Sequence, residues 1–182
     1  ADIVLHSSTK YIGGHNDVLA GLVVAKGDEL CERLAKQHYA AGAVLSPSDS
    51  WLLIRGLKTL HLRMDRHQEN AQAIAQFLES ERLVTDVIYP RKGGMVSFRI
   101  KKSEWIDPFL QHLKIITFAE SLGGVESFIT YPTTQTHGDI PEEERIRRGV
   151  CDKLLRFSVG LEHADDLIND LKQVFEHLRL LK

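Results

Sequence analysis

The residues best suited to chemistry lie close to the N-terminus, in segment 7–11, whose sequence is SSTKY. An apolar run, IVL, precedes this segment, and a second apolar run, 18–25, follows a pair of glycines. Hydroxyls and backbone N–H groups of a turn can bind a phosphate. A lysine that is kept from water loses proton affinity and becomes a nucleophilic amine. The pattern therefore predicts a strand, a hydroxyl-lined turn that carries Lys10, and a second strand.

Two interpretations of this turn remain open on the residues alone. A lysine beside serines is commonly a solvated loop residue, and Ser-x-Thr-Lys is a weak pattern with many chance matches. Pyridoxal phosphate carries both an aldehyde and a phosphate, so it would use the amine of Lys10 and the neighbouring hydroxyls together.

Arg156 is the second candidate, because it interrupts an apolar run, Leu154 to Val159. A guanidinium in apolar surroundings is costly unless it has a partner. That partner is either the carboxylate of a bound molecule, which an arginine can hold with two parallel hydrogen bonds, or an internal Asp or Glu. The pattern alone does not choose between them.

Composition excludes several classes of protein. The chain has 182 residues, enough for one sizeable core or for one domain and part of another, with 23 basic and 25 acidic residues. This balance gives no electrostatic reason to expect nucleic acid or a membrane surface as a partner, and no apolar run is long enough to cross a bilayer. Cys31 and Cys151 lie far apart without a CxxC pattern, which favours free thiols in a reducing cytoplasm. No secretory signal is visible, and the histidine spacing does not predict a metal site.

The apolar spacing predicts an α/β chain with short connections. We expect buried strands at 18–25 and 154–161, a half-exposed strand at 95–100, and helices at 29–41 and 163–181. A period of three to four residues continues from Trp51 to about Glu81 and predicts one long helix, capped by Ser48 or Asp49.

Four segments, in order along the chain, resemble one known family. Segment 7–17 (SSTKYIGGHND) is similar to the cofactor-lysine segment of the Cys/Met-metabolism, or trans-sulfuration, family of pyridoxal-phosphate enzymes. Segments 120–127 (ESLGGVES), 131–137 (YPTTQTH) and 155–162 (LRFSVGLE) match the same family. One such match can be chance, whereas four in order form a strong signal.

The resemblance implies the C-terminal part of a fold-type-I, aspartate-aminotransferase-like enzyme. Residues 1–50 would end the large cofactor-binding domain, 51–81 would form a long linking helix, and 82–182 would form the C-terminal α/β domain. One departure is visible: relatives usually carry a further helical insertion where this chain has only Arg91-Lys92.

The resemblance also assigns roles. Lys10 would bind pyridoxal 5'-phosphate covalently and then move protons as general base and acid. Ser7 and Thr9 would hydrogen-bond the cofactor phosphate. Arg156 would bind the substrate α-carboxylate, and Ser121 would hold both that carboxylate and the lysine.

Glu120 matches a pocket position that differs among relatives with different substrates, although simple solvation at a turn explains it equally well. Thr136 and His137 match family positions that we interpret as architecture.

The activity implied by the resemblance is a carbon–sulfur lyase reaction on a small sulfur amino acid. Bacterial cystathionine β-lyase is the first expectation, and cystathionine γ-synthase follows closely. The γ-lyases and O-acylhomoserine thiol-lyases come next. Relatives of this kind form homotetramers built from dimers with shared active sites. Because only the C-terminal half of the family pattern is present, the groups that hold the cofactor ring are missing. A non-catalytic fragment is therefore the alternative.

Overall fold

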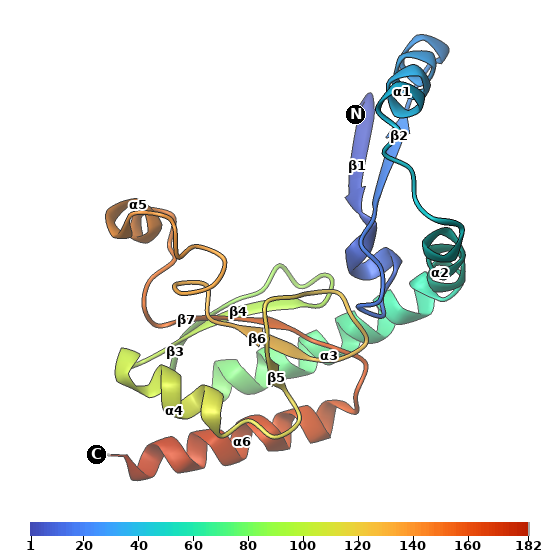
Figure 1. The fold of residues 1–182 in the computed structure, drawn as a ribbon. Coiled ribbons are helices and arrows are strands. Elements are labelled where there is room, and N and C mark those ends of the chain that lie inside the picture. The colour runs from blue at the N-terminus through green and yellow to red at the C-terminus, as the bar shows by residue number, and fades with distance from the viewer. Residues whose placement is uncertain (182) are drawn as a thin grey trace. The chain divides into compact units, whose positions relative to one another are not determined.

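The computed structural model describes residues 1–181 and divides into two compact units, which we describe separately. Unit 1 comprises Ala1–Leu60 and unit 2 comprises His61–Lys182 (Figure 1). No helix among the described residues is both long enough and apolar enough to cross a membrane. Both cysteines, Cys31 and Cys151, are free thiols.

Unit 1 is a β-ribbon followed by two helices. Its elements are β1 (Ile3–Ser7), the single turn η1 (Ser8–Ile12), β2 (Gly21–Ala25), α1 (Asp28–Ala41) and α2 (Pro47–Leu57). The two strands are antiparallel, with Ile3 opposite Ala25 and Ser7 opposite Gly21. The predicted order of strand, lysine turn and strand is therefore confirmed.

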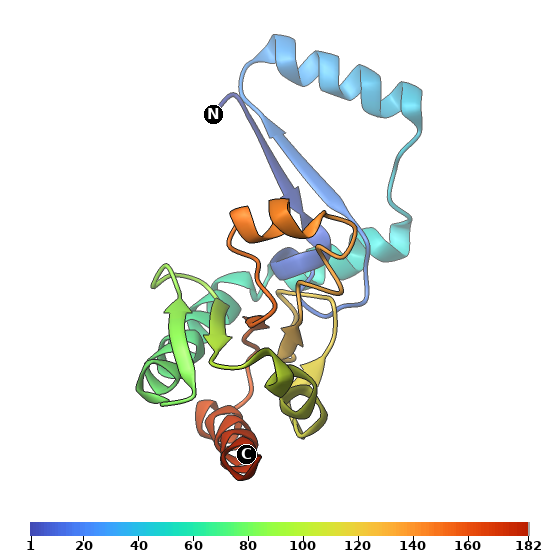
Figure 2. The same cartoon turned by 90° about the vertical axis from the view of Figure 1, so that its left-hand side faces the viewer.

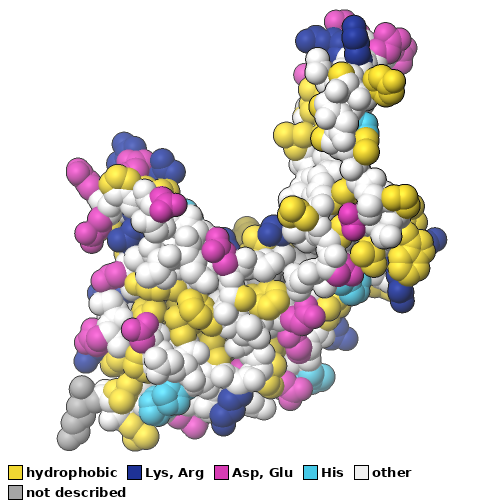
Figure 3. Space-filling view, viewed as in Figure 1, with side chains coloured by type: hydrophobic (Ala, Val, Ile, Leu, Met, Phe, Trp, Pro, Cys, Tyr) yellow, Lys and Arg dark blue, Asp and Glu magenta, His cyan; other side chains and the backbone are white. Residues whose placement is uncertain are grey.

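The prediction of a buried strand at 18–25 is wrong for this chain. The strand is shorter than expected, and four of its five residues are exposed. The cause is that β1 and β2 form a sheet of only two strands, and no residue of α1 is buried against it. Figure 3 shows apolar side chains on the surface of unit 1, over α2 and along the part formed by β1, β2 and α1.

The predicted single helix over 51–81 is two helices. Ser46, rather than Ser48 or Asp49, caps α2, because its hydroxyl accepts a hydrogen bond from the Asp49 N–H at 3.0 Å. The helix ends at Leu57, and α3 (Leu60–Ser80) begins after a turn in which the N–H and the hydroxyl of Thr59 both donate to the Gly56 carbonyl. The boundary between the units therefore falls inside the segment that we expected to be one linking helix.

Unit 2 contains a five-stranded sheet in the order β3-β4-β7-β6-β5. The strands are β3 (Val84–Ile88), β4 (Met95–Ile100), β5 (Thr117–Phe118), β6 (Phe128–Thr130) and β7 (Leu154–Ser158). The helices are α3, η2 (Ser103–Trp105), α4 (Ile106–Gln111), α5 (Glu142–Arg147) and α6 (Ala164–Leu180). All pairs are antiparallel except β5 with β6.

The core of unit 2 lies between the sheet and its helices α3, α4 and α6 (Figures 1 and 2). Along β4, residues alternate between buried and half-buried, as expected of a strand with one covered face. In β7, Leu155 and Phe157 point into this core. Arg156 lies between them in the sequence, so it belongs to the opposite face of the sheet.

The short connection between β3 and β4 is a closed hairpin. The Tyr89 hydroxyl donates to the Gly93 carbonyl at 2.9 Å, and the Gly93 N–H donates to the Gln68 side chain at 3.3 Å. Arg91 adopts a positive φ of 60° and pairs with Glu79. An arginine thus occupies a left-handed backbone conformation at residue 91, where a glycine would be free of strain.

Candidate functional site

The lysine turn of unit 1 is built on Ala20, the residue that directly precedes β2. The N–H groups of Ser8 and Thr9 both donate to the carbonyl of Ala20, at 2.9 and 3.2 Å. The Thr9 hydroxyl accepts from the Ala20 N–H at 2.9 Å. The backbone leaves helical geometry at Lys10, where φ is −92° and ψ is −129°. Lys10 thus lies at a kink, and the two residues before it are held by hydrogen bonds to Ala20.

Helix α2 supports this turn from within unit 1. A Cβ at Gly56 would lie 2.9 Å from the Ile12 carbonyl oxygen and would also clash with the Gly13 carbonyl. Only glycine allows α2 to approach the turn this closely. The position of Lys10 consequently depends on a residue 46 positions further along, which the sequence motif does not include.

The hydroxyls of the turn differ in how they are used. Ser7 is exposed and its side chain makes no hydrogen bond to residues 1–181. Thr9 is half-buried, and its own hydroxyl hydrogen points to the Ala20 carbonyl over a long 3.3 Å. Ser8 is fully buried, and its hydroxyl oxygen has no partner in the described chain. Ser7 therefore retains a hydroxyl donor, whereas the Thr9 hydroxyl is engaged by Ala20 both as donor and as acceptor. That these two hydroxyls bind a phosphate stays a prediction.

Lys10 is half-buried and forms no ion pair with any carboxylate among residues 1–181. An amine without a charged partner, beside two hydroxyl donors, fits the aldehyde and the phosphate of pyridoxal phosphate. The described residues thus fit one side of this cofactor. The groups that the resemblance assigns to its ring are not part of the chain.

Arg156 is the centre of the second group, which lies wholly in unit 2. Its guanidinium donates to the Thr130 hydroxyl at 3.2 Å, and its Nε is buried without a partner in the described chain. Burial lowers the pKa of Arg156, and the nearby negative charge of Glu120 partly opposes this shift. No Asp or Glu among residues 1–181 forms an ion pair with Arg156. The internal ion pair that the sequence left open as an alternative is therefore not found.

Loop 120–127 lies beside Arg156 on the same face of the sheet. The Thr130 hydroxyl, which accepts from Arg156, donates to the Ala119 carbonyl at 2.9 Å, just before Glu120. Further along the loop, the Gly123 N–H donates to the Ser158 hydroxyl at 3.0 Å. Glu120 thus lies close enough to Arg156 for its charge to act on the guanidinium, and Ser121 follows it in the same unit. Lys10, Ser7 and Thr9 are together in the other.

Sequence reasoning missed the residues that hold this loop. Thr130, Ser127 and Glu162 all make hydrogen bonds across the site, and two of them fall within matched family segments. Their types alone carried no signal, because serine and glutamate near a turn are usually solvated. Thr136 and His137 make a hydrogen bond of 2.7 Å to each other, in keeping with a structural role.

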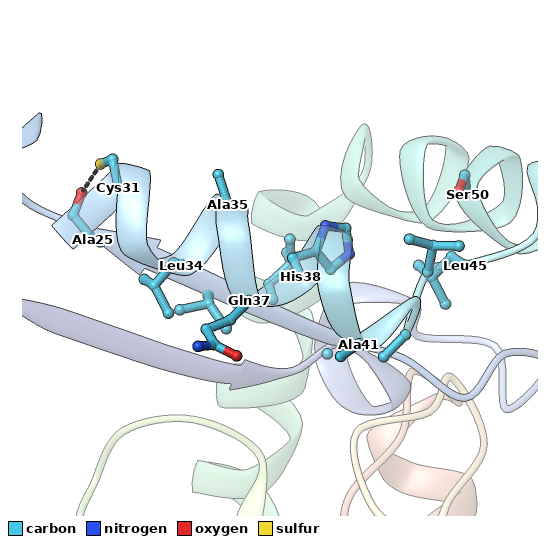
Figure 4. Close-up of a pocket in the computed structure, with 14 residues that line it drawn as sticks. Ala25, Cys31, Leu34, Ala35, Gln37, His38, Ala41, Leu45 and Ser50 are labelled. Carbon is cyan, nitrogen blue, oxygen red and sulfur yellow. Dashed lines mark hydrogen bonds between the residues drawn. The ribbon is translucent and has the colours of Figure 1, made fainter. Parts of the chain in front are cut away.

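A hollow in unit 1 lies elsewhere, between β2 and α1 (Figure 4). It measures about 980 Å³, and its lining includes Leu34 and Gln37 of α1, which point toward the strands. None of the predicted site residues lines it. The hollow exists because α1 stands away from β2 with no buried residue, so we do not assign chemistry to it.

Comparison with known proteins addresses the family. Residues 1–176 match the family model described as "Cys/Met metabolism PLP-dependent enzyme". Cystathionine gamma-synthase/O-acetylhomoserine (thiol)-lyase from Bacillus subtilis is 67% identical over 95% of this chain and 46% of its own length. Cystathionine gamma-synthase from Haemophilus influenzae is 64% identical over 98% of this chain and 48% of its own.

A β-lyase and a solved structure are also similar. Cystathionine beta-lyase from Lactococcus lactis subsp. cremoris is 47% identical, covering 97% of this chain and 50% of its own length. The structure of cystathionine gamma synthase from Xanthomonas oryzae pv. oryzae, in complex with cystathionine, superimposes with a TM-score of 0.91 at 41% identity. It covers 97% of this chain and 50% of that one. The chain thus spans about half the length of these relatives. It belongs to the Cys/Met-metabolism family of pyridoxal-phosphate-dependent enzymes, whose fold it shares.

Proposed function

We propose that this chain supplies Lys10, Arg156 and their neighbours to a trans-sulfuration enzyme of about twice its length. The observation that carries the proposal is the state of Arg156: a desolvated guanidinium with a buried, unpartnered Nε and no ion pair within residues 1–181. A half-buried cation of this kind calls for an anion from outside the chain. The α-carboxylate of an amino acid has the geometry for it.

The chain's own residues would divide the work as follows. Ser7 and Thr9 hold the phosphate through their hydroxyls, and Arg156 with Ser121 orients the substrate by its carboxylate. The amine of Lys10 takes the proton from the substrate α-carbon and returns a proton later in the reaction. When bound, pyridoxal phosphate withdraws electrons from the bonds at that carbon. Glu120, beside Arg156, is placed to influence which substrates are accepted.

Among the family reactions, we favour replacement at the γ-carbon of an acylated homoserine. There the acyloxy group leaves with its bonding electrons, and a thiol sulfur forms the new bond as it loses its proton. The support is the identity of 67% and 64% to two relatives named γ-synthases, against 47% to the β-lyase. This reverses the order expected from the sequence motifs, which placed the β-lyase first.

The length of the chain supports the same choice. The alignment with the β-lyase extends over 192 positions, more than the 182 residues of this chain, so that relative carries residues that this chain lacks. The alignment with the B. subtilis relative needs only 173 positions for 95% of this chain. In length, this chain therefore resembles the B. subtilis relative more than the β-lyase.

The test uses a completed protein, in which the part of the B. subtilis relative that this chain does not cover is joined to it in that relative's own order. Borohydride reduction with pyridoxal phosphate, followed by peptide mapping, should place the label on Lys10. Lys10→Ala should abolish the label and lower kcat by about 10²–10⁴-fold. A label on another lysine would overturn the role of Lys10.

Product analysis then separates the reactions. We expect cystathionine from an O-acylhomoserine and cysteine. Pyruvate and homocysteine from cystathionine would instead restore the β-lyase assignment, and 2-oxobutyrate and cysteine would indicate a γ-lyase. If no product forms although the completed protein binds the cofactor, the non-catalytic alternative is favoured.

The assembly is a proposal as well. We propose that the completed protein forms a homotetramer of dimers with shared active sites, as the family resemblance implies. Sedimentation at micromolar concentration would test it, and a monomer with full activity would refute it.

A further inference from the structure

A closed set of hydrogen bonds holds the far end of loop 120–127. The Glu162 carboxylate accepts the Ser127 N–H at 2.7 Å through one oxygen and the Ser127 hydroxyl at 2.8 Å through the other. The Ser127 hydroxyl in turn accepts the Gly160 N–H at 2.8 Å. We call Glu162, Ser127 and Gly160 the Glu162 latch. Because one partner is charged, its bonds belong to the strong class.

The latch leaves no room for a side chain at its centre. A Cβ on Gly160 would lie 2.6 Å from the backbone carbon of Glu126 and would also meet the Val125 carbonyl and the Glu162 carboxylate. The Leu161 N–H donates to the same Val125 carbonyl at 2.8 Å. The loop and the segment after β7 are thus in direct backbone contact.

Helix α3 fixes the other side of this segment. The Asn70 amide donates to the carbonyls of Gly160 and Glu162, at 3.0 and 2.8 Å. A His67 ring nitrogen lies 2.7 Å from the Val159 carbonyl. Both side chains are essentially inaccessible to solvent. The latch therefore rests on a rigid support rather than on a mobile loop.

The two ends of loop 120–127 are now both accounted for. At its start, Arg156 reaches the Ala119 carbonyl through Thr130, and at its end Ser127 is held by Glu162. Glu162 is the first acidic residue after Arg156 in the sequence. Its carboxylate accepts hydrogen bonds from Ser127 and forms no ion pair with Arg156.

We infer that Glu162 and Ser127 are positioning residues for a carboxylate-binding site at Arg156 and Ser121, holding the loop so that the guanidinium and the loop face one anion. The inference rests on the proposed function, since it takes Arg156 as the residue that contacts the carboxylate. Neither latch residue touches the ligand. Their effect is on the affinity for its carboxylate.

The experiment compares two ligands of the completed, cofactor-loaded protein that differ only by a carboxylate. Glycine and methylamine are titrated, binding is followed by the visible spectrum, and the Kd of methylamine divided by the Kd of glycine reports what the carboxylate contributes. We expect Glu162→Gln and Ser127→Ala to lower this ratio by about tenfold while methylamine binding stays unchanged. Equal weakening of both ligands would show a merely structural role and overturn the inference.

A matched control separates this effect from general destabilisation. Glu81 is another carboxylate of unit 2 that accepts a backbone N–H, from Leu83 at 3.0 Å, and a side-chain bond, from Arg179. Glu81→Gln should leave the ratio unchanged. If Glu162→Gln does not fold, Ser127→Ala decides, and hydrogen exchange at the Gly160 N–H should become faster in it.

Arg156→Met distinguishes the two levels of the proposal. If Arg156→Met leaves the methylamine-to-glycine Kd ratio unchanged, the carboxylate role of Arg156 fails, and the proposed function fails with it. If Arg156→Met removes the preference for glycine but both latch variants keep it, only the inference about the latch is refuted.

Discussion

Unit 1 and unit 2 are both rich in apolar residues but bury them very differently. The apolar core cluster of the described chain belongs entirely to unit 2, where side chains such as Phe98, Phe157 and Leu171 are inaccessible to solvent. In unit 1 the buried apolar side chains are Val18 and Leu53, each 8% exposed, while Leu5 and Val24 are 72% and 57% exposed.

This difference in burial indicates that unit 2 is the more stable of the two when each is considered alone. Burial of apolar surface is the dominant favourable term in folding, and isolated two-stranded ribbons are at best marginal in water. Unit 2 has a covered sheet face and three packed helices. Unit 1, which carries Lys10, has the sequence of a buried structure without a second layer. We therefore expect unit 1 to be the less stable of the two.

Hydrogen exchange of the 182-residue chain should show the largest contrast. We expect amides of β4 and β7 to exchange at least about 10³-fold more slowly than those of β1 and β2, because core strands open only with global unfolding. In the completed protein the ribbon should become protected. Equal protection of both units in the chain alone would break the comparison.

Matched leucine substitutions should sharpen it. Leu155→Ala removes a fully buried side chain of unit 2 and should lower the free energy of unfolding by about 2–5 kcal/mol. Leu22→Ala in β2 removes a side chain that is 41% exposed and should change stability by no more than about 0.5 kcal/mol. Urea unfolding of the chain measures both. A large loss from Leu22→Ala would mean that the ribbon is buried in solution.

Two serines extend the contrast to polar groups. Ser127→Ala deletes a hydroxyl with two partners and should cost about 1–3 kcal/mol, since it leaves Gly160 N–H unsatisfied. Ser8→Ala deletes a buried hydroxyl without a partner in the described chain and should be neutral or slightly stabilising. Thermal melts of the two variants give the answer. A loss of stability in Ser8→Ala would point to a partner for that hydroxyl.

The smallest expected effect is the pH dependence of unit 2 through His67. Burial lowers the pKa of His67, the bond to Val159 raises it, Arg63 lowers it and Glu162 raises it, with a net lowering. The unfolded chain, with a histidine pKa of about 6.5, therefore binds a proton more readily than the folded chain. Stability from the neutral ring is present above this pH and falls as the pH drops toward the lower, folded value.

His67→Gln should flatten this part of the stability curve, which urea titrations between about pH 8 and pH 5 would reveal. The variant His61→Gln serves as the control, because His61 lies on the same helix but is exposed to solvent. An unchanged slope in His67→Gln would assign the pH dependence to other groups.

The local sequence pattern was enough to predict those helices and strands whose bounds do not depend on the segments they pack against. The strand at 95–100 has the predicted bounds, because alternation and a preceding glycine pair are both local signals. The family motifs located Lys10 and Arg156 for a similar reason. The break at Lys58 and Thr59 was missed because the apolar period continues across it, and the turn appears only in the hydrogen bonds to Gly56.

The remainder depends on contacts between distant parts of the chain. Glu162 and Ser127 are 35 residues apart, and the sequence around each of them does not predict the hydrogen bond between them. Whether β2 is buried likewise depends on other protein, not on its own residues, which have the composition of a covered strand. Role by role, the site residues remain predictions that the structure of each unit supports.

The hairpin between β3 and β4 has a practical consequence. Its turn is closed by Tyr89, which packs against the core, and by Gly93, while Arg91 and Lys92 are exposed. Loops of this kind accept added length at a small entropic cost, so a fluorescent reporter or an affinity tag placed after Lys92 should leave the strand register intact. This exposed turn thus offers an attachment point for following the assembly of the protein.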